Sequence, residues 1–157
     1  MRKWLMLLAA LCLTATIDQA AKAWALHNLQ LYETAQPIPA LVPFFQLTLV
    51  SNSGAAFGIL PMAGDVFLVA ALLIIAGLLV GMRATAADAR LAPFATGLVI
   101  GGAIGNMLDR LQHGHVIDFI HYQIPEVISN VSNPADHAIV LGVLLIIAES
   151  FWRSRRA

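Results

Sequence analysis

Four apolar runs, each long enough to cross the hydrocarbon core of a bilayer, constrain this chain more than any other feature of its sequence. They lie at about 4–26, 66–82, 94–111 and 134–152. A helix needs about 20 mostly apolar residues to span that core, and about 17 at the least. Charged side chains make up only 11% of the chain, whereas soluble domains carry about a quarter. We therefore expect an all-α polytopic membrane protein with four transmembrane helices, forming one domain over residues 1–157.

The first apolar run begins after two basic residues, as the core of a cleaved signal peptide would. Its length exceeds that of a signal core, and it carries Asp18, Gln19 and Lys22 near its end. Trp4 and Trp24 also lie where aromatic residues mark the two membrane interfaces. These features favour a helix that is retained.

The basic residues predict the orientation of the four helices. Lys22 and Arg110 each lie close to an aspartate at one end of a helix. The other seven of the nine Lys and Arg residues fall on the opposite side if the helices alternate: Arg2, Lys3, Arg83, Arg90, Arg153, Arg155 and Arg156. Because basic residues are retained in the cytoplasm, both termini and the 83–93 loop are expected there, with 27–65 and 112–133 outside.

The first exterior loop has the pattern of a small folded cap over about 27–65. Residues 44–50 are β-branched and aromatic with partial alternation, and residues 51–54 form a turn signal after them. An open strand exposed to lipid is not tolerated inside the hydrocarbon, so we expect a short sheet on the outer membrane surface. The second exterior segment is expected to carry Asp118 in a loop.

Polar residues lie at the exterior ends of the first and third helices. Asp18 and Lys22 are four residues apart and share a helix face, as do Asn106, Asp109 and Arg110. An ion pair of Asp18 with Lys22 and a satisfied polar cluster at the helix ends would account for them structurally. The functional hypothesis is that these polar residues hold the reactive groups of a site in position. A stripe of small residues on the third helix, Gly97, Gly101 and Gly105, predicts close contact with a neighbouring helix.

The segment from Val116 to Asp136 carries two aspartates that are costly near lipid. Asn133 is predicted to cap the fourth helix, with Pro134 at its first position and Asp136 in its first turn, so capping alone would explain Asp136. Two carboxylates brought within a few ångströms share a proton, so that one acts as a base and the other as an acid. Such a pair can activate water for peptide hydrolysis. Two aspartates alone would also suit a proton or cation pathway.

Other kinds of site and of protein fit these residues less well. Histidines at 113, 115, 121 and 137 surround the aspartates, but no metalloprotease helix motif accompanies them, so no metal is expected. The serines lie in turns without a nucleophile elbow. An ion-coupled carrier would be expected to place its acids near the bilayer midplane. A purely structural membrane subunit would leave Asn52, Asn106 and Asn133 unexplained.

Taken together, these residues resemble the lipoprotein signal peptidases (signal peptidase II) of bacteria. Five blocks occur in the family's order: Asp18-Gln19-Ala20-Ala21-Lys22, Asn52-Ser53-Gly54-Ala55-Ala56-Phe57-Gly58, Gly105-Asn106-Met107-Leu108-Asp109-Arg110, Gly114-His115-Val116-Ile117-Asp118-Phe119 and Ser132-Asn133-Pro134-Ala135-Asp136. The match covers nearly the whole chain. One departure concerns the last block, where the family usually has phenylalanine at the position of Ser132 and an aliphatic residue at that of Pro134. It bears on the shape of the pocket and on inhibitor fit.

The resemblance implies an aspartic endopeptidase of the bacterial inner membrane, with its active site near the outer face. Its substrates would be prolipoproteins carrying diacylglyceryl on a cysteine, cut just before that cysteine. Globomycin-type peptides would inhibit it. No cofactor and no nucleic acid are implied. Asp118 and Asp136 would form the catalytic dyad. The residues implied to support it and to position substrate are Asp18, Lys22, Asn52, Gly54, Asn106, Asp109, Arg110 and Asn133.

Overall fold

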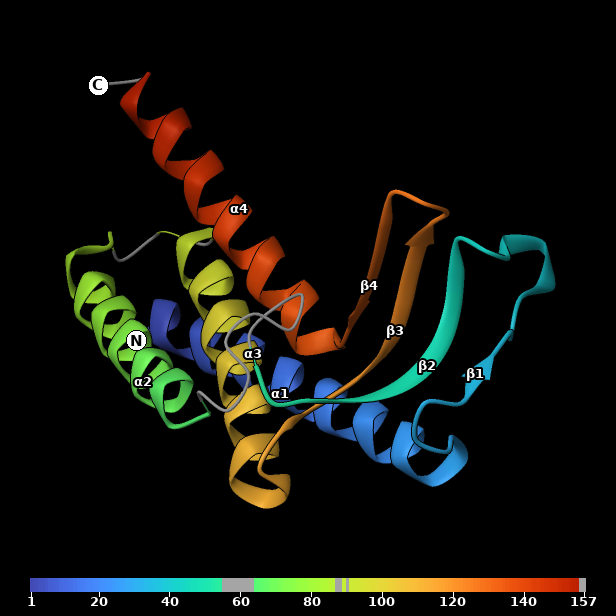
Figure 1. The fold of residues 1–157 in the computed structure, drawn as a ribbon. Helices are drawn as coiled ribbons and strands as arrows, with labels where there is room; N and C mark the ends of the chain where they lie inside the picture. Colours follow the sequence, from blue (N-terminus) through green and yellow to red (C-terminus); the bar gives the residue numbers. More distant parts are fainter. Residues whose placement is uncertain (55–63, 87–88, 90, 156–157) are drawn as a thin grey trace.

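Four long helices form the body of the protein (Figure 1). The computed structural model describes residues 1–54, 64–86, 89 and 91–155. The helices are α1 (Arg2–Asn28), α2 (Gly64–Ala84), α3 (Leu91–His113) and α4 (Pro134–Ser154). Each contains a stretch long and apolar enough to cross a membrane. The four predicted spans are confirmed; α4 begins at Pro134 as predicted, and every other end lies two or three residues beyond its predicted bound.

Helix α3 is the centre of this body, because α1, α2 and α4 all pack against it. The predicted glycine stripe lies in the contact with α1: a Cβ added at Gly101 would lie 2.7 Å from the Leu11 carbonyl oxygen. A second contact of this kind, which the sequence stripe did not predict, joins α3 to α4. There a Cβ at Gly142 would lie 2.7 Å from the Ala95 carbonyl oxygen. Small residues on α3 and on its neighbours therefore let the backbones approach closely.

Exchanging Gly101 for alanine is expected to destabilise the protein by about 1–3 kcal/mol, since the new methyl group meets backbone on α1 that has no room to move. Gly77→Ala on α2 is the matched control, because nothing lies within 4 Å of a Cβ there. Alanine is also the better helix former by about 1 kcal/mol. Thermal unfolding in detergent should separate the two variants. Equal stability would contradict the close α1–α3 contact.

A small antiparallel sheet lies beside one end of the helices and extends away from them (Figure 1). Its strands are β1 (Thr34–Ala35), β2 (Phe45–Asn52), β3 (Val116–Ile124) and β4 (Ile128–Ser132), hydrogen-bonded in that order. A short 3-10 helix, η1 (Pro39–Leu41), lies between β1 and β2. The strand predicted at 44–50 is confirmed as β2. The part of the predicted cap at 55–63, together with Arg90 and Arg156, lies outside the described residues.

The predicted loop around Asp118 is wrong, because this residue lies in the middle of the sheet. Helix α3 ends at His113, and Gly114, with a φ of +78°, turns the chain into β3. This strand pairs with β2 on one side and β4 on the other, with Val50 opposite Asp118. Its first four residues are all buried, so the apolar–polar alternation of a half-exposed strand is missing. The cap therefore includes β3 and β4 (residues 116–132) as well as the described residues 29–54 of the predicted segment.

An apolar cluster holds the sheet against the end of α1. Ala25 of α1 and Leu29, directly after the end of this helix, pack with Leu49 of β2 and with Ile117 and Phe119 of β3. Successive side chains of a strand point to opposite faces of the sheet. Packing Ile117 and Phe119 on this cluster therefore directs the intervening Asp118 to the other face.

Candidate active site

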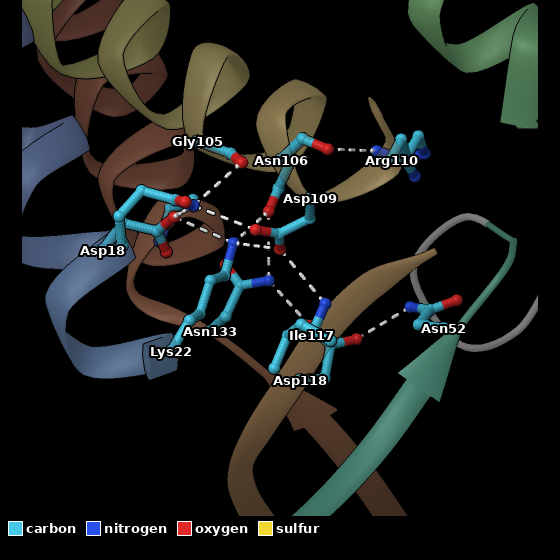
Figure 2. A network of polar contacts seen from close by, with 12 residues as sticks. Asp18, Lys22, Asn52, Gly105, Asn106, Asp109, Arg110, Ile117, Asp118 and Asn133 are labelled. Atoms are coloured by element: carbon cyan, nitrogen blue, oxygen red, sulfur yellow. Dashed lines mark hydrogen bonds and ion pairs between the residues drawn. The ribbon is translucent and has the colours of Figure 1, made fainter. Parts of the chain in front are cut away.

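Asp118 belongs to a network of polar contacts that joins β3 to α1, α3 and α4 (Figure 2). Only 1% of this residue is exposed. The side-chain amide of Asn52 donates a hydrogen bond to its Oδ2 at 2.8 Å, and that of Asn133 donates to its Oδ1 at 2.6 Å. Burial raises the pKa of Asp118 to about 6. The hydrogen bond from Asn52 opposes this increase, because it stabilises the ionised carboxylate, and the negative charge of Asp136 adds to it. Asp118 can therefore exchange a proton near neutral pH.

Asn52 reaches Asp118 through the register of the sheet. It ends β2 opposite Val116, two positions from the pair of Val50 with Asp118. Its side-chain oxygen accepts a hydrogen bond from the Gly54 backbone N–H at 3.0 Å, so the amide group is left to face the carboxylate. Gly54, predicted as a site residue, thus orients Asn52 through its own backbone.

Asp136 joins the same network from α4. As predicted, Asn133 caps this helix, accepting a hydrogen bond from the Asp136 backbone N–H at 2.9 Å. The side-chain amide of Asn106 donates to Asp136 Oδ1 at 2.8 Å, and the oxygen of Asn106 accepts from the Asn133 amide at 3.1 Å. Two asparagines, Asn106 and Asn133, therefore connect the two aspartates.

Lys22 lies between two further buried carboxylates (Figure 2). Its Nζ is 2.8 Å from Asp18 Oδ2 and 2.7 Å from Asp109 Oδ2, and it donates to Asn106 Oδ1 at 2.8 Å. The predicted Asp18–Lys22 pair is confirmed, and Asp109 completes a three-residue cluster. Each side chain in the cluster is at most 3% exposed.

The two acids of this cluster also hold the backbone beside the two aspartates. Asp18 Oδ1 accepts a hydrogen bond from the Ala135 N–H at 2.9 Å, and Asp109 Oδ2 accepts one from the Ile117 N–H at 3.1 Å. Ala135 directly precedes Asp136, and Ile117 directly precedes Asp118. The ion cluster thus fixes both segments that carry the aspartates.

Gln19 belongs to the same cluster, although the predicted site did not include it. Its amide is within hydrogen-bond distance of Asp18 Oδ2 at 3.2 Å, Asp109 Oδ1 at 2.9 Å and the Gly105 carbonyl oxygen at 3.2 Å. In the sequence, Gln19 is a polar side chain in an apolar run and belongs to the first of the five blocks that resemble the family. Its partners on α3 follow from helix packing, which the run itself does not specify.

Arg110 closes the network on the side of Gly54. Its Nη2 donates to the Gly54 carbonyl oxygen at 3.1 Å and its Nη1 to the Asn106 carbonyl oxygen at 3.3 Å. The guanidinium carbon lies 5.3 Å from the centre of the Phe67 ring on α2. Nε is buried without a hydrogen-bond partner in the described structure. Arg110 thus provides a fixed positive charge near both aspartates.

A pocket of about 420 Å³ opens beside these groups. Asp136, Asn106, Arg110, Asn52 and Gly54 line one part of it, whereas the buried Asp118 is not among its lining residues. The structure brings all ten predicted site residues into one network. Val116, Ile139 and Val140 line the apolar part of the pocket.

Three of the four histidines near the aspartates are hydrogen-bonded to hydroxyl groups. His115 is hydrogen-bonded to Ser51, His121 to Thr48 and Ser129, and His137 to Ser132. Within residues 1–54, 64–86, 89 and 91–155, no group of three or more His, Cys, Asp or Glu side chains is arranged to hold a metal ion.

Comparison with known proteins identifies the family. A family model described as signal peptidase (SPase) II matches residues 10–152. The chain belongs to the signal peptidase II family. The lipoprotein signal peptidase of Shewanella oneidensis is 42% identical over 142 residues, covering 88% of this chain and 81% of that protein. The lipoprotein signal peptidase of Pelotomaculum thermopropionicum is 42% identical over 130 residues, covering 83% and 81%.

Two solved structures share the fold of this signal peptidase II. Both are described as bacterial membrane enzymes studied by the in meso method, at 2.3 Å and 1.9 Å resolution. The first has a TM-score of 0.82 and 27% identity, covering 94% of this chain and 88% of its own; the second has a TM-score of 0.76 and 28% identity, covering 91% and 90%. The resemblance found in the sequence is thereby confirmed. The chain is a multi-pass protease of the bacterial inner membrane that cleaves signal peptides from prolipoproteins.

Proposed function

We propose that this signal peptidase II is an aspartic endopeptidase in which Asp118 and Asp136 form the catalytic dyad. The observation that carries the proposal is the joining of the two carboxylates through Asn106 and Asn133, beside a pocket. Catalysis by such a dyad requires one ionised and one protonated carboxyl group. That state supplies one base and one acid.

The proposed reaction uses a water molecule between the two carboxylates. The ionised aspartate takes a proton from the water as its oxygen attacks the carbonyl carbon of the scissile peptide bond. The protonated aspartate gives its proton to the amide nitrogen as the carbon–nitrogen bond breaks. Arg110 would bind the substrate backbone, and the amides of Asn52 and Asn133, which here donate to Asp118, would also pair with it.

The proposed substrates are prolipoproteins that already carry diacylglyceryl on a cysteine, cut directly before that cysteine. Both termini would lie in the cytoplasm and the site near the outer face, because the basic residues gather at the helix ends opposite the aspartates. Lys3 of α1, for example, donates a hydrogen bond to the Met82 carbonyl oxygen at 2.9 Å, at the far end of α2. Globomycin-type peptides would compete for the pocket.

A gel-shift assay on the purified enzyme tests this function. A diacylglyceryl-modified prolipoprotein is offered beside its unlipidated form, each with and without a metal chelator. Cleavage of the lipidated form alone, unaffected by chelator, is the expected result. Loss of cleavage with chelator would instead support a metal site among the histidines, and equal cleavage of both forms would contradict the proposed lipid requirement.

The pH profile of kcat/KM should have an acidic limb, a fall in activity toward lower pH, centred near pH 6. Burial raises the pKa of Asp118 to about 6, so the dyad would lose its base as the pH falls through that value. Because the hydrogen bond from Asn52 opposes this rise, Asn52→Ala should move the limb to higher pH. Profiles of kcat/KM against pH measure the shift, with Asn28→Ala as control, since Asn28 is exposed and hydrogen-bonded to the Trp24 carbonyl. An unmoved limb in Asn52→Ala would contradict the role of Asp118.

A further inference from the structure

Strand β4 is the last strand of the sheet, and its outer edge lies at the pocket. Among the described residues, β4 pairs with β3 alone, and it leads directly into α4 (Figure 1). Asn130, Val131 and Ser132 of β4 line the same pocket as Asp136 of α4. The outer edge of a sheet presents a row of backbone N–H and C=O groups to a chain that lies next to it.

Hydrogen bonds of β3 establish which of its residues bond toward β4. The Gln123 backbone N–H donates at 3.0 Å to the carbonyl oxygen of Phe44, which directly precedes β2. In a strand between two antiparallel neighbours, successive residues direct their N–H and C=O groups to opposite sides. Tyr122 and Ile120 therefore bond toward β4. In agreement, the Ile120 carbonyl oxygen accepts a hydrogen bond from the Ser132 hydroxyl of β4 at 3.4 Å.

Val131 is the residue of β4 that directs its backbone outward at the pocket. The two residues of β3 that bond toward β4 are paired with Asn130 and Ser132. Because Val131 lies between these two, its own N–H and C=O point away from β3, out of the edge of the sheet. Val131 and Asp136 line one pocket. An extended peptide that fills this pocket would therefore meet a backbone donor and a backbone acceptor beside the dyad.

A substrate cut at a membrane needs such partners. The backbone groups of a helical segment are hydrogen-bonded to one another, and an extended stretch around the scissile bond loses these bonds. Lipid offers no replacement for them. An extended peptide that adds to the edge of a sheet regains main-chain hydrogen bonds. The outer edge of β4 would supply them next to the scissile bond.

We propose that the substrate, extended beside its scissile bond, adds to the sheet as a strand next to β4, with one of its residues paired to the N–H and C=O of Val131. This inference rests on the proposed function and deepens it by naming where the substrate backbone binds. The role of Val131 comes from its backbone, so it does not depend on which side chain stands at this position.

Val131→Pro tests the donor, since proline is tolerated where the N–H of an edge strand points away from the sheet. Its kcat/KM for a lipidated prolipoprotein should fall about 3- to 10-fold, as one lost hydrogen bond allows. Val131→Ala keeps the N–H and should cleave like the wild type. Ser129→Pro is the matched control, because Ser129 also points outward two residues along the edge and does not line the pocket. Equal losses in the two proline variants would overturn the proposal.

Substrates with one backbone amide replaced by an ester test the acceptor. Each ester, placed at a bond other than the scissile one, removes a single N–H. At one position the ester should lower kcat/KM in the wild type and cost less in Val131→Pro, because the effects of paired groups are not additive. Ester effects that are the same in both enzymes at every position would contradict the pairing.

The size of the protein in detergent tests the other occupant that an open edge could bind, a second copy of this chain. We expect the same size for the wild type and Val131→Pro. A smaller assembly in Val131→Pro with an unchanged kcat/KM would overturn this proposal and leave the proposed function intact. Failure of the wild type to cleave a lipidated prolipoprotein would instead overturn the proposed function.

Discussion

Asparagine in place of Asp118 is expected to lower kcat by about 10³-fold or more, because the dyad loses one of its two proton-transfer groups. Asp136→Asn should lose a similar factor, since an amide at this position retains an oxygen for Asn106 and has no proton to exchange. Glu33→Gln is the matched control. This acid lies outside the network and accepts a hydrogen bond from the Gln30 backbone N–H. Cleavage of a lipidated prolipoprotein by the purified variants measures the effect, and substantial turnover by either dyad variant would contradict the assignment.

The stability of Asp118→Asn distinguishes loss of chemistry from loss of structure. Burial holds the pKa of Asp118 at about 6 in the folded protein, against about 3.9 in an unfolded chain. The stability that the protonated carboxyl contributes is therefore complete below about pH 4 and is lost as the pH rises through about 6. The Asp118→Asn protein does not lose stability in this way, because an asparagine side chain does not titrate. Relative to the wild type, the variant should gain about 2 kcal/mol of unfolding free energy between pH 4 and pH 7.

Thermal unfolding in detergent at pH 4 and pH 7 tests this gain. An inactive variant whose relative stability increases with pH has lost its catalysis while keeping its fold. If Asp118→Asn loses stability equally at both pH values, Asp118 does not carry a raised pKa, and the proposed basis of the acidic limb fails with it.

The spanning helices were predictable because lipid imposes a length and a composition that each helix must meet by itself. The N-terminal capping of α4 was predictable because it too depends only on neighbouring residues: Asn133, Pro134 and Asp136 form a local signal. The strand that carries Asp118 was not. Its partner β2 lies far away in the chain, and its first residues are buried on both faces, so no local alternation remained to indicate a strand.

The site residues were predicted as a set, but their roles depend on contacts between distant segments. The sequence placed Asp18 and Lys22 on one helix face, yet it did not indicate that Asp18 would hold the Ala135 N–H. The predicted set of site residues also left out Gln19, whose partners Asp109 and Gly105 lie on α3. Periodicity describes one helix at a time, whereas these bonds follow from the close α1–α3 approach that the glycine stripe permits.

Lys22→Met is expected to destabilise the protein by about 3–5 kcal/mol, because it leaves buried carboxylates without their cation. Lys22 lies 2.8 Å from Asp18 and 2.7 Å from Asp109, and both side chains are at most 3% exposed. Methionine fills a similar volume, so the loss would come from charge rather than from a cavity. Thermal unfolding in detergent measures it. A Lys22→Met protein as stable as the wild type would contradict a buried, charged cluster.

A triple variant separates the two roles of this cluster. Asp18→Asn and Asp109→Asn, combined with Lys22→Met, remove all three charges and keep oxygens that can accept from the Ala135 and Ile117 N–H groups. Most of the lost stability should return, since replacing every member of a buried ion cluster is far less costly than removing one. Catalysis should return only in part. Burial raises the pKa of Asp118, and the positive charge of Lys22 lowers it, so the acidic limb of the triple variant should move to higher pH. An unmoved limb with full activity would mean that Lys22 holds the structure and does not adjust the proton affinity of Asp118.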